Sequence, residues 1–436
     1  MGYYDAALAS LAHVLATRTG EDEAGLRAKT MFTMGQVCLT ACRPEDALEW
    51  FTKVMAVVGD DEDIVTQVRN ARADCEAKRR GAEWLGMLDK RAATVYRRRG
   101  QLDKAVGRMA DARAVCKRDA NLVLNEAEVL HCMGKYDEAA ALVDAFGPDR
   151  AATSVHERLM FVYRLKFLHL AGRPERLLAA TEAAGDFASL LSEDERATFR
   201  SEVVVGELTG MMETEQPLPG TPLVDIVGDS HVLPLAWRRT DDGQQIVAHY
   251  VPGLKAFHCA VPRMDVMPDD SFAPLGGLRY HMGQIRNAGR KHMVLVAGEI
   301  DARWEEGLGL AVRKQIYPSL AVAAWRTVEA YVSGVDELAA EFALDVKVAT
   351  VPPARRVLFP ELEIDHERAS AVKAFNEALR AVFSKPSTPQ HVRLLDMEAA
   401  FCAMGRDAPD TTFLDGVHAT GAAWTAQLAA AGAFSR

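Results

Sequence analysis

A proline-rich segment, residues 211–222, divides the sequence into two parts with different periodicities. Before it, residues 1–210 show helical spacing of apolar residues, broken by short turns that contain glycine or proline, and almost no run typical of a strand. After it, short aliphatic runs alternate with helical stretches, which is the pattern of a parallel sheet covered by helices. We therefore predict a helical domain over 1–210, a linker over 211–222 and an α/β domain over 223–436, with few contacts across the linker.

Turns in residues 1–210 recur with a common plan, in which a small residue opens the helix that follows. Two of them, at residues 100–105 and 134–139, place Ala105 and Ala139 34 residues apart. Apolar residues follow each alanine at helical spacing, and one hairpin cannot bury such a stripe alone, so neighbouring hairpins must stack. This part of the chain resembles tetratricopeptide repeats, whose period is about 34 residues. The resemblance implies a repeat array that binds a protein partner.

The array predicted from these turns is irregular. Turns at residues 43–47 and 172–177 fit the same plan at other spacings, and the turn at residues 2–7 matches only the second helix of a hairpin. Either the sequence begins inside the array, or residues 1–18 form an atypical cap.

Five runs in the second part have the composition of strands. They are residues 223–227, 246–250, 293–297, 346–351 and 392–395. Helical stretches over 310–343 and 366–383 lie between them, and an alanine-rich helix over 422–434 follows the last. We expect a parallel sheet flanked by helices.

The first of these runs ends in Gly228, Asp229 and Ser230. Glycine allows a tight turn, and the next two residues stand where a helix N-cap belongs. A serine at the carboxyl end of a parallel strand lies at the edge where α/β proteins bind ligands, which makes Ser230 a candidate nucleophile. A serine that only caps a helix fits the same residues.

A nucleophilic serine needs a histidine as its base, and that histidine needs an acceptor to orient it. Of the twelve histidines, only His418 stands three residues after an aspartate, Asp415. One turn of chain can place that carboxylate beside the imidazole, and Gly416 permits the fold-back. A surface histidine after a helix capped by Asp415 is the alternative interpretation.

Together these two motifs resemble the first and last conserved blocks of the SGNH, or GDSL-type, hydrolases. The blocks are Gly228-Asp229-Ser230 and Asp415-Gly416-Val417-His418, and the resemblance covers about residues 222–436. It implies an SGNH-like, flavodoxin-like three-layer fold. In it, Ser230 attacks an ester carbonyl and donates its N–H to the oxyanion. His418 would then relay the proton and Asp415 would orient His418. The first block with His231 also resembles SGNH domains of polysaccharide O-acetyltransferases, in which the acyl group passes to a sugar hydroxyl.

The inner blocks of the family match less closely. The family pattern Gly-x-Asn-Asp falls on residues 298–301, with Ile300 in place of the asparagine that donates to the oxyanion. Gly276 and Gly277 are candidates for a second oxyanion donor. Losing one donor typically costs roughly 10²–10³ in turnover, so either another group substitutes or the chain is slow or inactive. Further possible neighbours of the site are Asp229, His231, Gly298, Asp301 and Arg303, and possible replacement donors are Arg279, His281 and Arg303.

Composition limits the other function classes. A net charge of −10 disfavours nucleic-acid binding, and the basic stretch over residues 78–99 is typical of a solvated helix face. No apolar run is long enough to span a membrane, and the amino terminus lacks the apolar stretch of a secretory signal. Seven cysteines without paired spacing favour a reducing, cytoplasmic setting. The histidine spacings match no metal site and no phosphate-binding loop occurs, so we expect neither a metal nor a cofactor.

These patterns predict a serine-dependent ester hydrolase that acts on a small acyl or carbohydrate-linked ester, with repeats that recruit a protein partner. The alternatives are an O-acyltransferase of the same fold and a catalytically impaired scaffold protein. Ser230, Asp415 and His418 favour the enzyme, whereas Ile300 favours the scaffold.

Overall fold

The fold is that of a computed structural model of residues 1–436. The described residues are 2–17, 24–40, 44–58, 66–71, 82–115, 119–147, 154–185, 190–199, 214–260, 272–304, 306–352, 363–385, 389–403 and 420–434, with single positions between 203 and 212. They form two compact units. The first consists of Met1–Val95 and Lys104–Leu122, and the second of Tyr96–Asp103 and Val123–Arg436.

The first unit is helical, with α1 (Gly2–Thr17), α2 (Ala24–Thr40), α3 (Pro44–Val58) and most of α5 (Ala82–Arg98) and α6 (Leu102–Val115). Helices α2 and α3 form a hairpin around Phe51, which is fully buried. Gly35 makes this packing possible, because a Cβ at that position would lie 2.5 Å from the Phe51 ring. A small residue is therefore required where the two helices of the hairpin meet.

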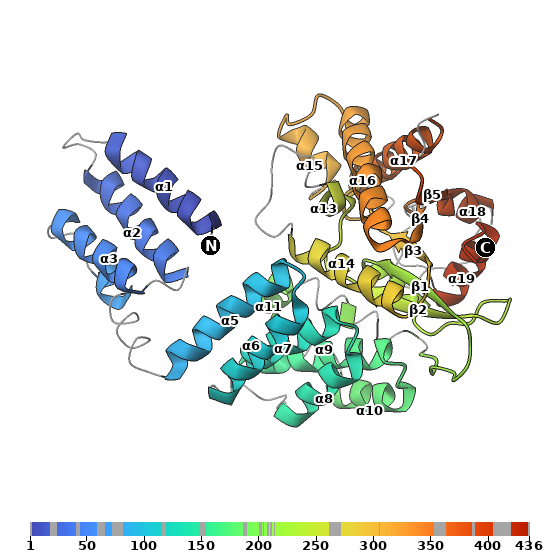
Figure 1. The fold of residues 1–436 in the computed structure, drawn as a ribbon, viewed down its shortest axis with the longest axis horizontal. Coiled ribbons are helices and arrows are strands. Elements are labelled where there is room, and N and C mark those ends of the chain that lie inside the picture. Colours follow the sequence, from blue (N-terminus) through green and yellow to red (C-terminus); the bar gives the residue numbers. More distant parts are fainter. Residues whose placement is uncertain are drawn as a thin grey trace. The chain divides into compact units, whose positions relative to one another are not determined.

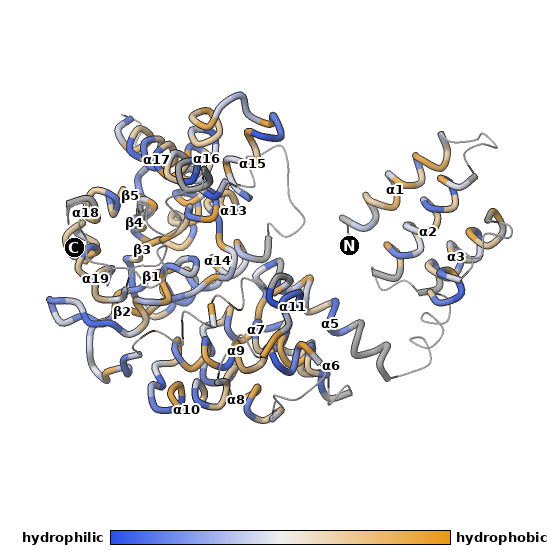
Figure 2. Tube along the Cα trace, turned by 180° about the vertical axis from the view of Figure 1, so that it is seen from behind, coloured by the Kyte–Doolittle hydropathy of each residue, from blue (hydrophilic) through white to orange (hydrophobic). Residues whose placement is uncertain are grey.

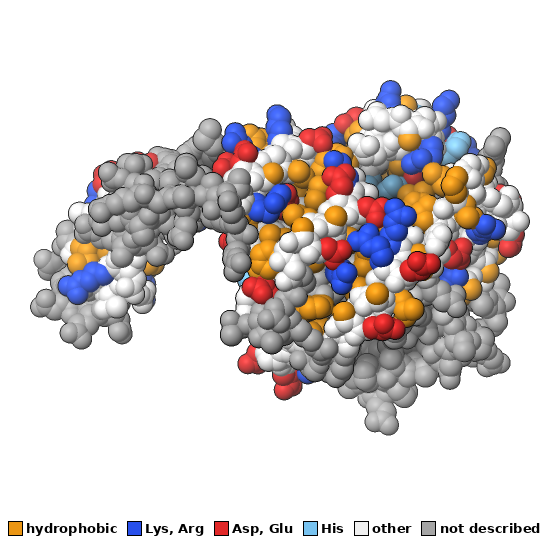
Figure 3. Space-filling model, turned by 90° about the horizontal axis from the view of Figure 1, so that it is seen from below, with side chains coloured by type: hydrophobic (Ala, Val, Ile, Leu, Met, Phe, Trp, Pro, Cys, Tyr) orange, Lys and Arg blue, Asp and Glu red, His pale blue; other side chains and the backbone are white. Residues whose placement is uncertain are grey.

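The second unit begins with helices of the predicted array. These are α7 (Ala120–Cys132), α8 (Tyr136–Phe146), α9 (Val155–Leu170), α10 (Pro174–Ala184) and the short α11 (Glu193–Thr198). Gly134 and Gly172, both with a positive φ, sit in the turns before α8 and α10. Ion pairs join the exposed sides of these helices, Arg173 to Asp137 at 2.7 Å and Arg176 to Asp144 at 2.9 Å. The face drawn in Figure 3 likewise carries basic and acidic side chains close together.

A five-stranded parallel sheet forms the centre of the second unit (Figure 1). Its strands are β1 (Leu223–Gly228), β2 (Gln245–Tyr250), β3 (His292–Val296), β4 (Asp345–Ala349) and β5 (Val392–Leu395), in the order β2-β1-β3-β4-β5. Each pairing between neighbours is parallel. This confirms the predicted α/β class, and the order is that of flavodoxin-like sheets.

Helices cover both faces of the sheet, which makes three layers. One face packs against α13 (Ala256–Ala260), α14 (Phe272–Asn287), α16 (Leu320–Phe342) and α17 (Glu363–Phe383). The other packs against the 3-10 helix η3 (Ser230–Leu235), α18 (Met397–Ala403), α19 (Gly421–Ala430) and residues of α8 and α9. Figure 2 shows hydrophobic and hydrophilic residues interspersed along these helices, as expected where one side of a helix meets a core.

The free edge of β2 is covered by the helices that precede the sheet. Tyr136 donates its hydroxyl to the Ala248 carbonyl at 3.4 Å, and His131 Nε2 donates to the Tyr250 carbonyl at 3.0 Å. Further along, the Trp237 ring donates to the Leu170 carbonyl at 2.7 Å. Because an exposed strand edge invites unwanted pairing, this cover protects the sheet.

The expected boundary at residues 211–222 lies inside the second unit, not between the units. Tyr136, Leu170 and Ala171 of the helical part share one buried cluster with Ile226 and Ile246 of the sheet. The expectation of few contacts across this segment therefore does not hold for helices α8 and α9.

All five predicted strand positions are confirmed to within two residues. The helical stretch predicted over 310–343 is confirmed for most of its length, but it consists of two helices, α15 (Leu308–Arg313) and α16. Gln315 adopts a left-handed conformation with φ of 57°, and Ser319 caps α16 by accepting a bond from the Val322 N–H. These two residues end one helix and start the next. Among the helices described, none combines the length and apolar character needed to cross a membrane.

Candidate functional site

The candidate site lies where the strand order reverses. Strand β1 has β2 on one side and β3 on the other, so the chain leaves the carboxyl ends of β1 and β3 toward opposite faces. Ligands of parallel α/β sheets bind in the crevice at such a switch point. Ser230 follows β1 by two positions at this edge, is half-buried, and is the first residue of η3.

Gly228 brings the end of β1 close to β3. A Cβ on Gly228 would lie 2.4 Å from the Val296 carbonyl oxygen, so no larger residue fits there without a shift of the backbone. The same carbonyl accepts the Asp229 N–H at 3.3 Å. The elbow that carries Ser230 is thus tied directly to the neighbouring strand.

Asp229 and His231 form a buried pair on either side of Ser230. The Asp229 carboxylate accepts the backbone N–H of His231 at 3.0 Å and the ring Nδ1–H of His231 at 2.9 Å. Burial lowers the pKa of His231, but the charge and hydrogen bond of Asp229, together with the charge of Glu299, raise it above its ordinary value. This pair fixes the first turn of η3, and the Asp229 side chain is the cap of that turn.

Residues 298–301 follow β3 at the same edge. Gly298 has a φ of 116°, and a Cβ there would lie 2.6 Å from the Phe375 ring, so both its conformation and its space require glycine. Ile300 is 9% exposed, which places an apolar side chain where the resemblance expects an amide. No residue of 298–301 has a side-chain amide that could replace the asparagine of the family pattern.

Glu299 is the centre of an ion-pair cluster beside these residues. Its carboxylate contacts Arg303 at 3.0 Å and pairs with Arg368 of α17. Burial raises the pKa of Glu299, but Arg303 and Arg368 lower it by more, to about 2. The same charges reach His231, whose pKa Glu299 raises and Arg368 lowers. Glu299 and Arg368 therefore belong to the electrostatic environment of the Ser230 elbow.

Asp301 has a structural role in this arrangement. Its carboxylate accepts the N–H groups of Ala256 at 2.7 Å and Phe257 at 3.0 Å, which caps the first turn of α13. Burial raises the pKa of Asp301 to about 6, although these two hydrogen bonds lower it. Asp301 also lines a cavity of about 940 Å³ together with Phe257, Tyr317 and residues of α15 and α16.

Gly276 and Gly277 lie within α14, at its fifth and sixth positions, where backbone N–H groups bond inside the helix. A Cβ on Gly276 would lie 2.9 Å from the Arg97 carbonyl oxygen, and one on Gly277 would lie 3.3 Å from Val251. These contacts give both glycines a packing role. The geometry offers no support for them as oxyanion donors.

The other sequence candidates are placed as follows. Arg279 pairs with Glu341, and His281 is buried with its ring 4.8 Å from that of His249. Asp415 and His418 lie outside the described residues, so the structure does not bear on the predicted triad. Among the residues described, no group of three or more potential ligands is arranged to hold a metal ion.

Sequence reasoning missed Glu299 and Arg368. Glu299 stood inside the Gly-x-Asn-Asp segment at the position that the family pattern leaves open. Arg368 is 69 residues away on another element, so no local pattern could have connected the two.

Comparison with known proteins adds no assignment. A scan against models of protein families finds no match, and a search of curated proteins finds no significant relative.

Proposed function

We propose that the chain is a serine-dependent ester hydrolase of the SGNH type, with Ser230 as its nucleophile. The observation that carries this proposal is the position of Ser230, two residues beyond β1 at the switch point of a β2-β1-β3-β4-β5 sheet. A nucleophile there faces the crevice in which α/β proteins bind ligands. The Asp229–His231 pair and the bond to β3 supply the rigidity that an attacking group needs.

In the proposed reaction the Ser230 hydroxyl oxygen attacks the ester carbonyl carbon and its proton passes to His418. The tetrahedral intermediate collapses, the alcohol leaves with that proton, and an acyl-serine remains. Water then attacks the acyl-serine carbonyl and gives one proton to His418. As this second intermediate collapses, His418 returns the proton to the Ser230 oxygen and the carboxylic acid is released. Asp415 holds the imidazole in the required tautomer throughout.

A specific observation favours the scaffold alternative. Ile300 is almost fully buried and offers no N–H to an oxyanion, while the neighbouring Glu299 is held by two arginines. In that alternative the elbow at Ser230 binds a ligand without turning it over. An O-acyltransferase differs from the hydrolase only in the acceptor, which would be a sugar hydroxyl in place of water.

Labelling of Ser230 tests the proposal without a known substrate. A fluorophosphonate should phosphonylate Ser230, since it reacts with activated serines, and mass spectrometry of the digested protein should find the adduct on that residue. Ser230→Ala should lose both the adduct and the hydrolysis of p-nitrophenyl acetate. Ser333→Ala, on α16, is the matched control and should keep both. A folded protein without adduct, whose ester hydrolysis equals that of Ser230→Ala, would leave the scaffold alternative standing.

A further inference from the structure

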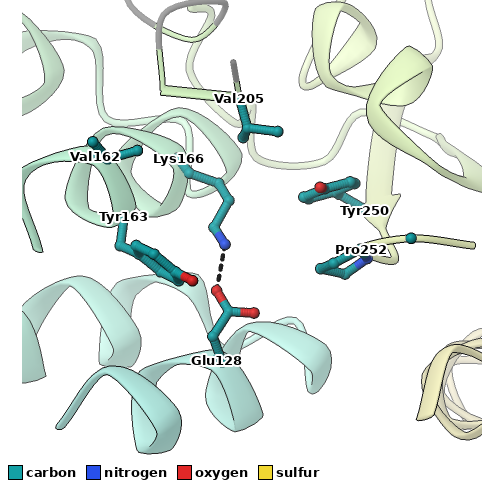
Figure 4. Close-up of a pocket in the computed structure, with 8 residues that line it drawn as sticks. Glu128, Val162, Tyr163, Lys166, Val205, Tyr250 and Pro252 are labelled. Atoms are coloured by element: carbon teal, nitrogen blue, oxygen red, sulfur yellow. Dashed lines mark hydrogen bonds and ion pairs between the residues drawn. The ribbon is translucent and has the colours of Figure 1, made fainter. Parts of the chain in front are cut away.

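A second cavity lies at the carboxyl end of β2, between α7, α9 and the loop that follows the strand (Figure 4). Its volume is about 290 Å³, and its polar lining comes from Glu128, Tyr163, Lys166 and Tyr250. We call it the repeat cavity, because α7 and α9 belong to the predicted repeat array. The proposed reaction does not use it.

Lys166 and Glu128 form an ion pair in the wall of the repeat cavity. Lys166 is only 6% exposed, and burying a cation is costly unless its N–H groups find acceptors. An ammonium group has three donors, and among the described residues Glu128 is the acceptor of one. The second Glu128 oxygen points into the space facing Pro252 in Figure 4. Among the described residues, the Lys166 ammonium thus has donors, and Glu128 an acceptor oxygen, that can serve a ligand at the same wall of the cavity.

Aromatic rings form the rest of this wall and the wall opposite. The Lys166 ammonium lies 4.3 Å from the ring centroid of Tyr163 and 5.9 Å from that of Tyr250. Figure 4 shows Tyr163 beside the ion pair, and Tyr250 and Pro252 across the cavity from it. Val162 and Val205 add apolar surface. The cavity therefore combines two ring walls with one paired donor and acceptor.

These features select a neutral hydroxylated ring as the ligand. The ammonium and the carboxylate cancel each other's charge, so an ionic ligand gains little net attraction, whereas adjacent hydroxyls can accept from one and donate to the other. The C–H groups of a sugar ring pack on the negative face of an aromatic ring. A volume of 290 Å³ lies near the lower limit of small-molecule pockets, roughly 300 Å³, which fits a single ring.

The repeat cavity and the proposed nucleophile are at the same edge of the sheet, on neighbouring strands. Tyr250 pairs in register with Gly228, two residues before Ser230, and neighbouring strands lie about 4.8 Å apart. The repeat cavity and Ser230 therefore lie beyond the carboxyl ends of neighbouring strands.

We propose that the repeat cavity is a binding subsite for one neutral sugar ring of the substrate. Residues of α7 and α9 then bind the sugar ring, and Ser230 at the edge of the sheet reacts with the ester. The binding part of this proposal stands on the cavity alone, while its link to catalysis rests on the proposed ester hydrolase function.

Saturation-transfer NMR on the full-length protein tests the binding part. The probes are glucose, galactose and N-acetylglucosamine as neutral rings, and glucuronic acid as the charged comparison, each up to about 50 mM because single-sugar sites are often only millimolar. At least one neutral sugar should bind to both the parent and Ser230→Ala. The double variant Glu128→Gln/Lys166→Met, which keeps the volume of the ion pair but removes its charges, should weaken binding at least tenfold. Tyr163→Leu should do the same, and Tyr317→Leu, in the other large cavity, should bind like the parent.

The proposal is overturned if no neutral sugar binds, if glucuronic acid binds more tightly than the neutral rings, or if both cavity variants bind like the parent with unchanged melting curves. Its failure can be told apart from failure of the hydrolase proposal. If sugar binds but Ser230 is not labelled by the fluorophosphonate, the subsite proposal stands and the hydrolase proposal fails. If Ser230 is labelled but no sugar binds, the hydrolase proposal stands and the subsite proposal fails.

Discussion

Ile300 is the residue at which the candidate site departs most from the family that it resembles. Its side chain is buried beside Glu299 and offers no hydrogen bond to a developing oxyanion. Ile300→Asn should raise the rate of p-nitrophenyl acetate hydrolysis by roughly tenfold or more, because one oxyanion donor is typically worth about 10²–10³ in turnover. Ile300→Leu, which stays apolar, should leave the rate unchanged. If a folded Ile300→Asn variant hydrolyses the ester no faster than Ile300→Leu does, position 300 does not contact the oxyanion.

At the residue scale, the sequence pointed to Asp229, Ser230 and His231 because all three stand in one short motif. It missed the partnership of Glu299 with Arg368 because the two lie on different elements and meet only after the sheet has formed. The resemblance also suggested Gly276 as an oxyanion donor, since a glycine that allows close packing and one that donates an N–H look alike in a sequence.

Helix α14 shows how a glycine serves an element. Gly276→Ala would place its Cβ 2.9 Å from the Arg97 carbonyl and the Gly100 N–H, backbone atoms that cannot move without shifting the turn between α5 and α6. We expect a loss of about 1–3 kcal/mol in the free energy of unfolding, as for other overpacked positions. Gly283→Ala on the same helix meets only the Phe342 ring at 3.5 Å and should gain roughly 0.5–1 kcal/mol from helix propensity. Urea denaturation measures both.

The same pair of variants tests the packing role of Gly276. If Gly276→Ala unfolds in urea like the parent, that packing role is wrong. Ester hydrolysis does not bear on the oxyanion prediction here, because alanine keeps the backbone N–H.

At the element scale, periodicity was sufficient to find every strand, because the buried aliphatic runs are short and separated by turn residues. It failed between α15 and α16, although Pro318, directly before the Ser319 cap, is a sequence signal for a helix boundary. The left-handed Gln315 interrupts the helix there, and no glycine marks the position.

For the whole second unit, the composition break at residues 211–222 was a poor guide to contacts. The proline-rich segment changes the periodicity of the chain, but the helices before it return to cover the edge of β2. Which strand the helices cover depends on which strand lies at the edge of the sheet. The periodicity of the strands does not predict their order.

Two buried histidines attach the helices before residue 211 to β2 and η3, and this attachment should be sensitive to acid. His131 donates to the Tyr250 carbonyl, and His169 donates to the Leu233 carbonyl at 2.8 Å. Burial lowers the pKa of His131 to about 3 and that of His169 to about 4. Both rings are therefore neutral in the folded protein near pH 5, whereas the unfolded chain protonates them below about 6.5. Their contribution to stability is complete above pH 6.5 and is lost as the pH falls toward the folded pKa values.

His131→Gln measures this contribution, because a glutamine amide can still donate to the Tyr250 carbonyl but does not titrate. The free energy of unfolding should fall with decreasing pH more steeply in the parent than in the variant, by about 1.4 kcal/mol per pH unit between pH 6 and 5. Groups with the opposite sign, such as Asp301 with its pKa raised to about 6, occur in both proteins and cancel in the comparison. His292→Gln, whose side chain is 65% exposed, should follow the parent. Parallel curves for the parent and His131→Gln would show that His131 does not couple proton binding to the attachment of the helices.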